Sequence, residues 1–415
     1  MTTAPSSRAV ALSRVHTRRE QVDVLLDQLP FPDQALSWVR AGQGLVGWGE
    51  AARFEAHGPD RFAEVDRWWR DYVAGVDVHN ELGVPGTGPT AFVSMAFADE
   101  PGHSVLIVPE VVIGQRDGVS WVTEIGRSAV TRPLAKPVRR PKRVHYTEGE
   151  LTVDGYRDAV RAAVTRMKAG ELGKVVLAHD VLATTDGPID VRFLLRELAA
   201  RYPNCWAYAV DGLIGATPEL LLRRTGQVVS SRVLAGTTWP RPGVSDDDLA
   251  AALLGSRKDQ DEHAYAVASL ADTLRPFCAT MTVDEQPSVL RLHNVLHLSS
   301  EVGGILDRET SLLRLSEAVH PTAAVGGTPR QLAIPLIREL EGMDRGRYAG
   351  PIGWIDGNGD GEMGVALRCA KVDGSTARLF AGCGIVADSD PDTEVREAAA
   401  KLVPMREALE GADRS

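Results

Sequence analysis

The sequence predicts an α+β fold with large, mostly antiparallel β-sheets flanked by helices. Three observations lead to this prediction. Strand-like runs follow one another across turn signals, helical patterns lie between those runs, and Asp373-Gly374 joins the last two runs as in a β-hairpin. With 415 residues, the chain is long enough to form one large domain or two smaller ones.

The N-terminal part is predicted to be rich in strands. Residues 91–97 and 104–113 are dominated by apolar side chains, and a polar Asp-Glu-Pro-Gly turn separates them, so each run is expected to form one strand. Residues 132–143 are basic and punctuated by prolines, which predicts a linker without regular structure. We therefore expect residues 1–143 to form a β-rich part of the same compact unit, and residues 144–415 to form the catalytic region.

Two helices are predicted from the spacing of apolar residues. The first has its apolar residues at i, i+3, i+4 and i+7, before a stop at Gly170: Val160, Ala163, Val164 and Met167. The second begins near Lys258, and its apolar face consists of Val267, Leu270, Ala271 and Leu274. A buried strand is predicted between them, at residues 174–178.

The C-terminal end is predicted to contain a hairpin and then a helix. Residues 363–372 and 377–386 are expected to be the two strands of the hairpin. Asp390 and Pro391 follow, and they offer a helix N-cap and a proline at the first helical position.

The composition excludes some classes of function. A net charge of −10 argues against nucleic-acid binding, which needs a basic face, and it requires any site for an anionic substrate to carry local positive charge. The start of the chain lacks the apolar segment of a signal peptide, and no run approaches the ~18 apolar residues of a membrane span. Four widely spaced cysteines are expected to be buried apolar residues in a reducing compartment. We therefore expect a cytoplasmic protein with no nucleic-acid or membrane partner.

Two apparent motifs do not hold. Residues 359–364 match GxGxxG, but they lead into a strand instead of opening a helix, so they do not predict dinucleotide binding. Asp356, Asn358 and Asp360 imitate the start of a calcium-binding loop, but Leu367 stands where that loop needs a bidentate glutamate. This stretch is predicted to be a turn between strands.

The strongest indication of function is an ordered series of segments that begins at residue 174. It includes Lys174-Val-Val-Leu, Ser256-Arg-Lys-Asp-Gln-Asp-Glu-His, His320-Pro-Thr-Ala-Ala-Val-Gly-Gly and Phe380-Ala-Gly-Cys-Gly-Ile-Val, with others at 215–222, 234–237, 348–354, 366–370 and 394–401. In this order the segments resemble the chorismate-utilising enzymes, a family that includes isochorismate, salicylate, anthranilate and aminodeoxychorismate synthases. The resemblance covers about the last 250 residues closely, and it implies the anthranilate synthase component I-like fold.

The resemblance implies a catalytic pair. Lys174 matches the general base and Glu219 the general acid of the isochorismate and salicylate synthases. Isomerisation requires water to attack C2 while the C4 hydroxyl leaves, so a base and an acid are needed together. A lysine with its ordinary pKa is a poor base at neutral pH, and a glutamate must have a raised pKa to stay protonated.

The resemblance also implies a magnesium site. Glu394, Glu397 and Lys401 share one helix face by their spacing, a pattern that on its own is more often a solvated, salt-bridged surface. The resemblance instead makes Glu262 and Glu397 ligands of Mg²⁺, with Glu394 in support.

The remaining candidate residues would hold the substrate, chorismate. Arg368, Tyr348 and the Gly382 backbone are expected to hold its enolpyruvyl carboxylate, since an arginine fork can pair bidentately with a carboxylate. The full substrate-binding set is Gly236, Thr237, Ala324, Tyr348, Arg368, Gly382 and Lys401. His263, His297 and His320 lie within the motifs and are expected to be supporting residues, whereas His179, where the family usually has arginine, is expected to make a structural hydrogen bond.

Two positions favour an isochorismate synthase within the family. Lys174 suits the activation of water, and Ala324 stands where amine-adding and pyruvate-releasing relatives commonly carry threonine. A salicylate synthase, which would go on to eliminate pyruvate, is the alternative, and a non-catalytic chorismate-binding relative is a further one. The pathway, whether menaquinone, siderophore or salicylate biosynthesis, stays open, and we expect a monomer.

Overall fold

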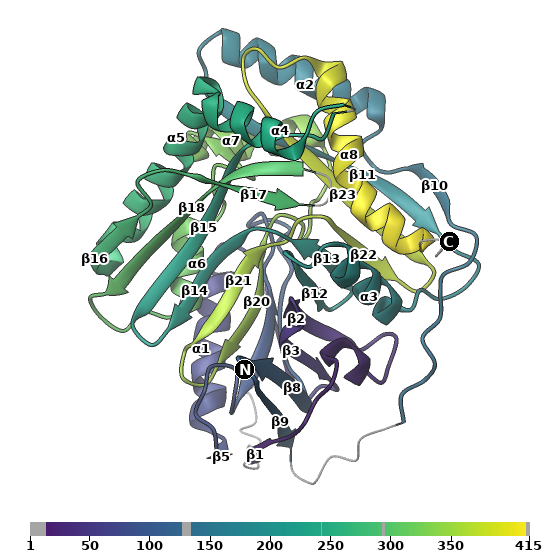
Figure 1. Ribbon diagram of the computed structural model, residues 1–415, viewed down its shortest axis with the longest axis vertical. Coiled ribbons are helices and arrows are strands. Elements are labelled where there is room, and N and C mark those ends of the chain that lie inside the picture. The colour runs from purple at the N-terminus through teal and green to yellow at the C-terminus, as the bar shows by residue number, and fades with distance from the viewer. Residues whose placement is uncertain (1–13, 127–133, 242, 293–294, 412–415) are drawn as a thin grey trace, which may run out of the picture.

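The computed structural model describes residues 14–126, 134–241, 243–292 and 295–411, and their strands form two large sheets (Figure 1). The first sheet has thirteen strands, in the spatial order β10 (His145–Glu148), β11 (Lys174–Thr184), β23 (Thr376–Ile385), β22 (Cys369–Asp373), β13 (Leu213–Thr217), β12 (Trp206–Val210), β2 (Leu36–Arg40), β3 (Gln43–Trp48), β8 (Val111–Arg116), β9 (Val119–Gly126), β1 (Arg14–Arg19) and β5 (Asp77–Asn80), with β19 (Gly327–Thr328) paired to β11.

The second sheet has ten strands. Their spatial order is β16 (Cys278–Val283), β18 (Val295–Leu306), β15 (Val228–Thr238), β14 (Leu220–Thr225), β21 (Gly361–Val365), β20 (Pro351–Asp356), β6 (Thr90–Ser94), β7 (Ser104–Val108) and β4 (Ala52–Ala56), with β17 (Ser288–Leu292) paired to β18. Among the described strands, only β1 and β5 pair in parallel. The predicted α+β class with mostly antiparallel sheets is confirmed.

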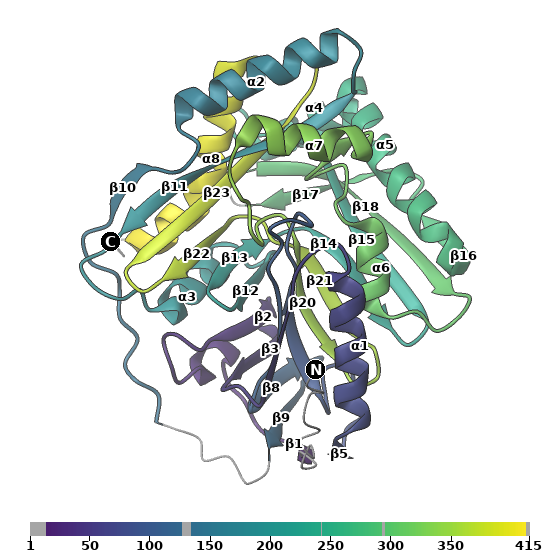
Figure 2. The same ribbon diagram turned by 180° about the vertical axis from the view of Figure 1, so that it is seen from behind.

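Helices flank both sheets (Figure 2). They are α1 (Arg61–Ala74), α2 (Val153–Lys168), α3 (Val191–Arg201), α4 (Asp246–Gly255), α5 (Arg257–Leu274), α6 (Leu312–Val319), α7 (Arg330–Glu341) and α8 (Pro391–Glu410), with the short 3₁₀ turns η1 (Leu25–Gln28) and η2 (Arg275–Phe277). The predicted helices correspond to α2, α5 and α8. Asp390 caps α8 as expected, since its side chain accepts a hydrogen bond from the Thr393 N–H.

Two predictions of single long strands were wrong, for one physical reason. Residues 104–113 are β7 and β8, and residues 363–372 are β21 and β22; in each case the chain leaves the ten-stranded sheet and enters the thirteen-stranded one. Pro109 has no N–H for a ladder at the first crossing. Arg368 takes a left-handed conformation (φ 50°) at the second. A third crossing, between β13 and β14, contains Pro218 and Glu219.

The two halves of the sequence share both sheets. β2 pairs with β12, and β6 pairs with β20, so strands from before residue 143 hydrogen-bond to strands from after it. One hydrophobic core contains buried side chains from both parts, from Val15 to Leu409. The division at residue 143 itself stays a prediction.

The predicted linker is fixed in part by a buried arginine. Residues 134–143 form no helix or strand, while 132 and 133 lie outside the described residues. Arg192, only 1% exposed, pairs with Asp190 at 2.7 Å. Its guanidinium also donates to the carbonyl oxygens of Pro30 and Lys136, each at 2.9 Å. A side chain of α3 thus ties the linker to an N-terminal segment.

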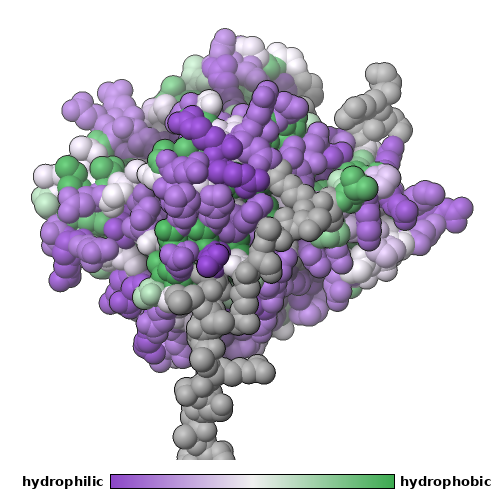
Figure 3. All heavy atoms as spheres, turned by 90° about the horizontal axis from the view of Figure 1, so that it is seen from below, coloured by the Kyte–Doolittle hydropathy of each residue, from purple (hydrophilic) through white to green (hydrophobic). Residues whose placement is uncertain are grey.

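The surface seen in Figure 3 is mostly hydrophilic, with apolar residues in small groups. In the described part of the chain, no helix combines the length and the apolar character needed to cross a membrane.

Ser256→Ala is expected to lower the free energy of unfolding by about 1 kcal/mol. The Ser256 side chain accepts a hydrogen bond from the Asp259 N–H at 3.3 Å and bonds the Asp259 carboxylate, which is a capping arrangement at the start of α5. Urea unfolding followed by circular dichroism measures the change. Ser256→Thr, which keeps the hydroxyl, is the control and should lose less. Equal stability of the alanine variant and the wild type would contradict the prediction.

Candidate active site

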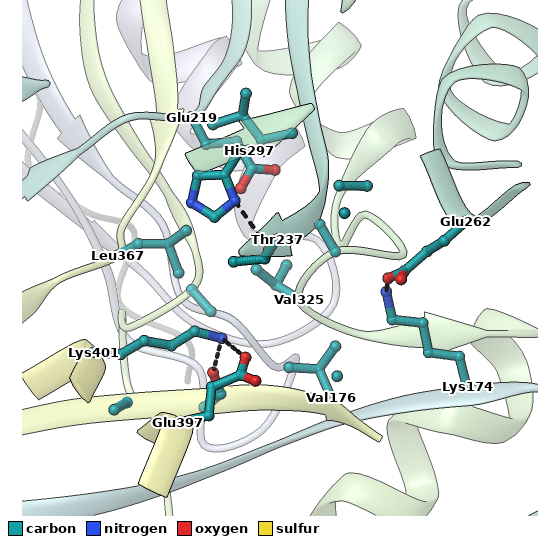
Figure 4. A pocket seen from close by; sticks show the side chains of 18 of the residues that line it. Lys174, Val176, Glu219, Thr237, Glu262, His297, Val325, Leu367, Glu397 and Lys401 are labelled. Atoms are coloured by element: carbon teal, nitrogen blue, oxygen red, sulfur yellow. Dashed lines mark hydrogen bonds and ion pairs between the residues drawn. The ribbon is translucent and has the colours of Figure 1, made fainter. Parts of the chain in front are cut away.

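A cavity of about 380 Å³ brings together most of the predicted site residues (Figure 4). Twelve of them line it: Lys174, Glu219, Gly236, Thr237, Glu262, Ala324, Tyr348, Arg368, Gly382, Glu394, Glu397 and Lys401. These residues are far apart in the sequence, on β11, β15, β23, α5, α8 and the connections between sheets. His263 and His320 do not line it.

Lys174 stands at the start of β11, where its ammonium meets a carboxylate. Its Nζ lies 2.7 Å from Oε1 of Glu262 on α5. Burial would raise the pKa of Glu262, but the charge and hydrogen bond of Lys174 outweigh burial and hold that pKa below its usual value. Gly384 on β23 makes room for the lysine, because a β-carbon there would lie 2.8 Å from Lys174 Cε. The absence of a side chain at Gly384 therefore accommodates the side chain of Lys174.

Glu219 lies at the crossing between β13 and β14, on a different side of the cavity from Lys174 (Figure 4). The residue is 8% exposed, and its carboxyl group takes part in no hydrogen bond or ion pair with the described residues. Burial raises the pKa of Glu219 to about 7, against an opposing effect of the Lys174 charge. A large fraction of this carboxyl group is therefore protonated at neutral pH, as a general acid requires.

Basic and aromatic groups form another part of the wall. Lys401 on α8 donates to the carbonyl oxygen of Gly382 at 2.9 Å and pairs with Glu397 at 2.8 Å. The Arg368 guanidinium has no hydrogen bond or ion pair among the described residues, and burial lowers its pKa. Tyr348 stacks on Phe380 with ring centroids 5.1 Å apart. An arginine without a partner in a half-buried wall is suited to hold an anion.

Thr237 is oriented by a bulge in β15. Gly236 (φ 72°) stands where the pairing with β18 shifts register, and a β-carbon there would lie 3.2 Å from Asp259. Beyond the bulge, the Thr237 hydroxyl bonds Nδ1 of His297 at 3.0 Å. Burial lowers the pKa of His297 to about 3, so this ring is neutral at physiological pH.

Carboxylates on two helices provide candidate ligands for a cation. Glu394, Glu397 and Cys383 have possible ligand atoms within 4.8 Å of one another, and Glu262 lines the same cavity from α5. Burial raises the pKa of the Cys383 thiol to about 12, which leaves the carboxylates as donors. Oxygen donors of this kind fit Mg²⁺. In this structure lysines neutralise Glu262 and Glu397.

Two of the histidines expected to be supporting, His263 and His320, are buried outside the cavity. His263 bonds the Ala235 carbonyl at 3.2 Å and the Ser300 hydroxyl at 2.8 Å, which holds α5 against the second sheet. His320 bonds the Phe97 carbonyl at 2.9 Å. His179 is buried beside Tyr156, and its Nδ1 has no partner among the described residues, so the structural hydrogen bond expected of it is not made by that atom.

Several residues that line the cavity were missed as site residues, among them Lys258, Asp259 and Arg345. Lys258 precedes Glu262 by one helical turn. Lys258 lies within the Ser256–His263 segment, so the motif contained a signal for it. His297, expected to be a supporting residue, lines the cavity from β18.

A buried ion pair supplies hydrogen-bond partners to the open edge of β11 near Lys174. Between β19 and β10, one edge of β11 has no neighbouring strand. Arg345 donates to the Val176 carbonyl at 2.7 Å, and Glu341 accepts from the Ala178 N–H at 2.7 Å. Arg345 and Glu341 bond each other and are 3% and 1% exposed. Because these side chains satisfy backbone groups that a strand would otherwise satisfy, they fix β11 two residues from Lys174.

The stretch that imitates a calcium loop is a turn, as predicted. The Asp356 carboxylate accepts hydrogen bonds from the N–H groups of Gly86, Asn358 and Asp360 at 2.9 to 3.0 Å. These bonds use the oxygens that a calcium ion would need.

Comparisons with known proteins show the family to which this chain is similar. Residues 10–124 and 111–410 match the family model described as chorismate binding enzyme. Isochorismate synthase MenF of Bacillus subtilis is 39% identical over 269 residues, and the match spans 63% of this chain but only 57% of that protein.

Two further similarities cover nearly the whole chain. The salicylate biosynthesis isochorismate synthase of Pseudomonas aeruginosa is 34% identical over 404 residues, which cover 90% of this chain and 84% of that protein. The structure of MenF, the menaquinone-specific isochorismate synthase of Escherichia coli, superposes with a TM-score of 0.79 at 25% identity and covers 96% of this chain and 94% of that one. The predicted family resemblance is confirmed.

Proposed function

The chain belongs to the chorismate-binding enzyme family, and we propose that it is an isochorismate synthase that converts chorismate to isochorismate. One observation carries the proposal: a lysine and a glutamate with a raised pKa line one cavity from different sides. Addition of water at C2 with loss of the C4 hydroxyl needs a base and an acid in this relation. Ala324, in the same cavity, favours this product over salicylate.

Each of the two residues has a defined task. Lys174 takes a proton from the water that attacks C2, and Glu219 gives its proton to the C4 hydroxyl, which departs as water. In this structure the ammonium of Lys174 is held by Glu262, so the lysine must first lose a proton before it can accept one from the attacking water. Glu219 has no such constraint, because its carboxyl group is free of partners among the described residues.

The remaining groups would bind the two carboxylates of chorismate. Glu262 and Glu397, with Glu394 beside them, are the residues we propose for Mg²⁺, which when bound would neutralise the ring carboxylate. Arg368 and Lys401 would receive the enolpyruvyl carboxylate, with Tyr348 beside them. These cations provide the local positive charge that a chain of net charge −10 otherwise lacks.

Arg368→Leu is expected to lower kcat/KM by about 10- to 100-fold, chiefly through KM, because one charge-assisted contact to the substrate is worth about 1.5–3 kcal/mol. Steady-state kinetics on chorismate measure the change. Arg368→Lys keeps the charge but not the fork, so it should restore part of the loss. An unchanged KM in the leucine variant would show that this guanidinium does not hold the substrate.

The proposal is tested by incubating the pure protein with chorismate and Mg²⁺ and resolving the products by chromatography. Isochorismate without pyruvate is expected, and EDTA should abolish it. Formation of salicylate with pyruvate would agree with the family but would contradict isochorismate as the product. Persistence of full activity in EDTA would contradict the metal site, and no consumption of chorismate would contradict the enzymatic proposal.

A further inference from the structure

A second cavity lies on the other side of the wall that contains Glu219. Its volume is also about 380 Å³, and Glu219, Ala266 and Ala324 line both cavities. Apart from the glutamate, the shared residues are alanines, so the partition between the cavities contains little side-chain volume. The second cavity lies between α5 and α6, which pack on the second sheet, and the start of α7, which packs on β11 of the first sheet (Figure 2).

The lining of the second cavity is mixed, and its polar side chains include groups that can bond water. Its hydroxyl-bearing residues are Ser231, Tyr265, Ser269, Thr273, Thr322 and Thr328. The Thr322 hydroxyl oxygen is buried and has no hydrogen-bond partner among the described residues, and such atoms are usually satisfied by ordered water. Tyr265 and Ser269 are exposed, so this cavity reaches the surface on α5.

The proposed reaction creates a need for such a cavity. In each turnover the C4–O bond breaks, the C4 hydroxyl takes the proton of Glu219 and becomes a molecule of water, and a C2–O bond forms to another water. Glu219 is left as a carboxylate next to the released water. At that moment the first cavity holds the product, so the second cavity, which shares Glu219 with the first, offers the water and the proton a path that does not cross the bound molecule.

We propose that the second cavity is a water site serving Glu219, through which the departing water leaves and a proton returns while the substrate or product occupies the first cavity. This inference rests on the proposed isochorismate synthase function. It assigns the side chains of Ser269 on α5 and Ala318 on α6 to the walls of a solvent route, with no contact to the substrate.

The test narrows the proposed water route by substitutions at residues that do not line the first cavity. Ser269→Phe and Ala318→Phe each place a phenyl ring in the second cavity, from different helices. Ala268→Phe is the matched control, since Ala268 is exposed on α5 and lines neither cavity. Each enzyme is incubated in H₂¹⁸O with an equilibrium mixture of chorismate and isochorismate, and mass spectrometry locates the label. Initial-rate kinetics are measured in parallel.

Label at C2 of isochorismate reports water taken up beside Lys174, and label at C4 of chorismate reports water taken up beside Glu219 in the reverse reaction. In both blocked variants kcat and the C4-to-C2 labelling ratio are expected to fall together, each by about tenfold, which corresponds to ~1.4 kcal/mol of added barrier. The control should behave as the wild type.

The other outcomes overturn the inference. A fall in kcat with an unchanged labelling ratio would mean that the phenyl rings only disturb the surroundings of Glu219. Unchanged kcat and ratio in both blocked variants would mean that water reaches Glu219 by another way. Wild-type enzyme that incorporates no label at C2 would contradict the proposed function itself, which separates that failure from failure of the water route.

Discussion

Glu219→Gln is expected to lower kcat by about 10²- to 10⁴-fold, the usual contribution of a positioned general acid. Glutamine has nearly the same shape as a protonated glutamic acid, and it adds no charge to a site that is 8% exposed. The amide cannot transfer a proton to the departing C4 hydroxyl. KM should change little, because the binding groups Arg368, Tyr348 and Lys401 are untouched.

The pH dependence of the same step provides an independent check. Burial raises the pKa of Glu219 to about 7, and the acid is active only while it carries its proton. The wild-type kcat should therefore be lost as pH rises through about 7. Glu219→Gln should lose this dependence, because the amide does not titrate.

Glu219→Asp is the matched control, because it keeps a titratable carboxyl group at this position. Aspartic acid can still donate a proton, but from a shorter side chain, so its activity should lie between those of the wild type and the glutamine variant. Near-wild-type kcat in Glu219→Gln, with the alkaline decline intact, would remove Glu219 from the role of general acid.

Much of the fold was predictable because it depends on local patterns. The spacing of Val160 to Met167 predicted α2, and Asp390-Pro391 predicted the start of α8. The long runs at 104–113 and 363–372 were each predicted as one strand, because a mostly apolar run looks the same whether it forms one strand or two strands of different sheets. The break at Arg368 depends on a left-handed residue that the sequence does not mark.

The membership of the site was predictable, but its electrostatics were not. Twelve predicted residues line the cavity. They could be predicted because the family resemblance contains long-range information that no local pattern contains. The pairing of Lys174 with Glu262 and the raised pKa of Glu219 follow from burial and distance. The part played by His297 depends on how β18 pairs with β15, 60 residues away in the sequence.

Arg345→Met is expected to lower the free energy of unfolding by about 3–5 kcal/mol, the usual cost of removing one partner of a buried ion pair. The change leaves Glu341 without its counter-charge and the Val176 and Val325 carbonyls without their donor. Urea unfolding measures the loss. Arg338→Met is the matched control, because Arg338 lies on α7, as Glu341 does, but is 75% exposed and pairs only loosely with Glu100, at 3.8 Å.

The same pair should also affect catalysis through β11. Arg345 and Glu341 hold the backbone at Val176 and Ala178, and Lys174 lies two residues before Val176. Arg345→Lys keeps a cation near Glu341 but supplies fewer donors, so most of the protein should fold while Lys174 is less well placed. We expect kcat to fall with little change in KM in this variant. If Arg345→Lys folds and retains the wild-type kcat, the pair stabilises the sheet without positioning the lysine, since a loss confined to stability is what a purely structural ion pair would give.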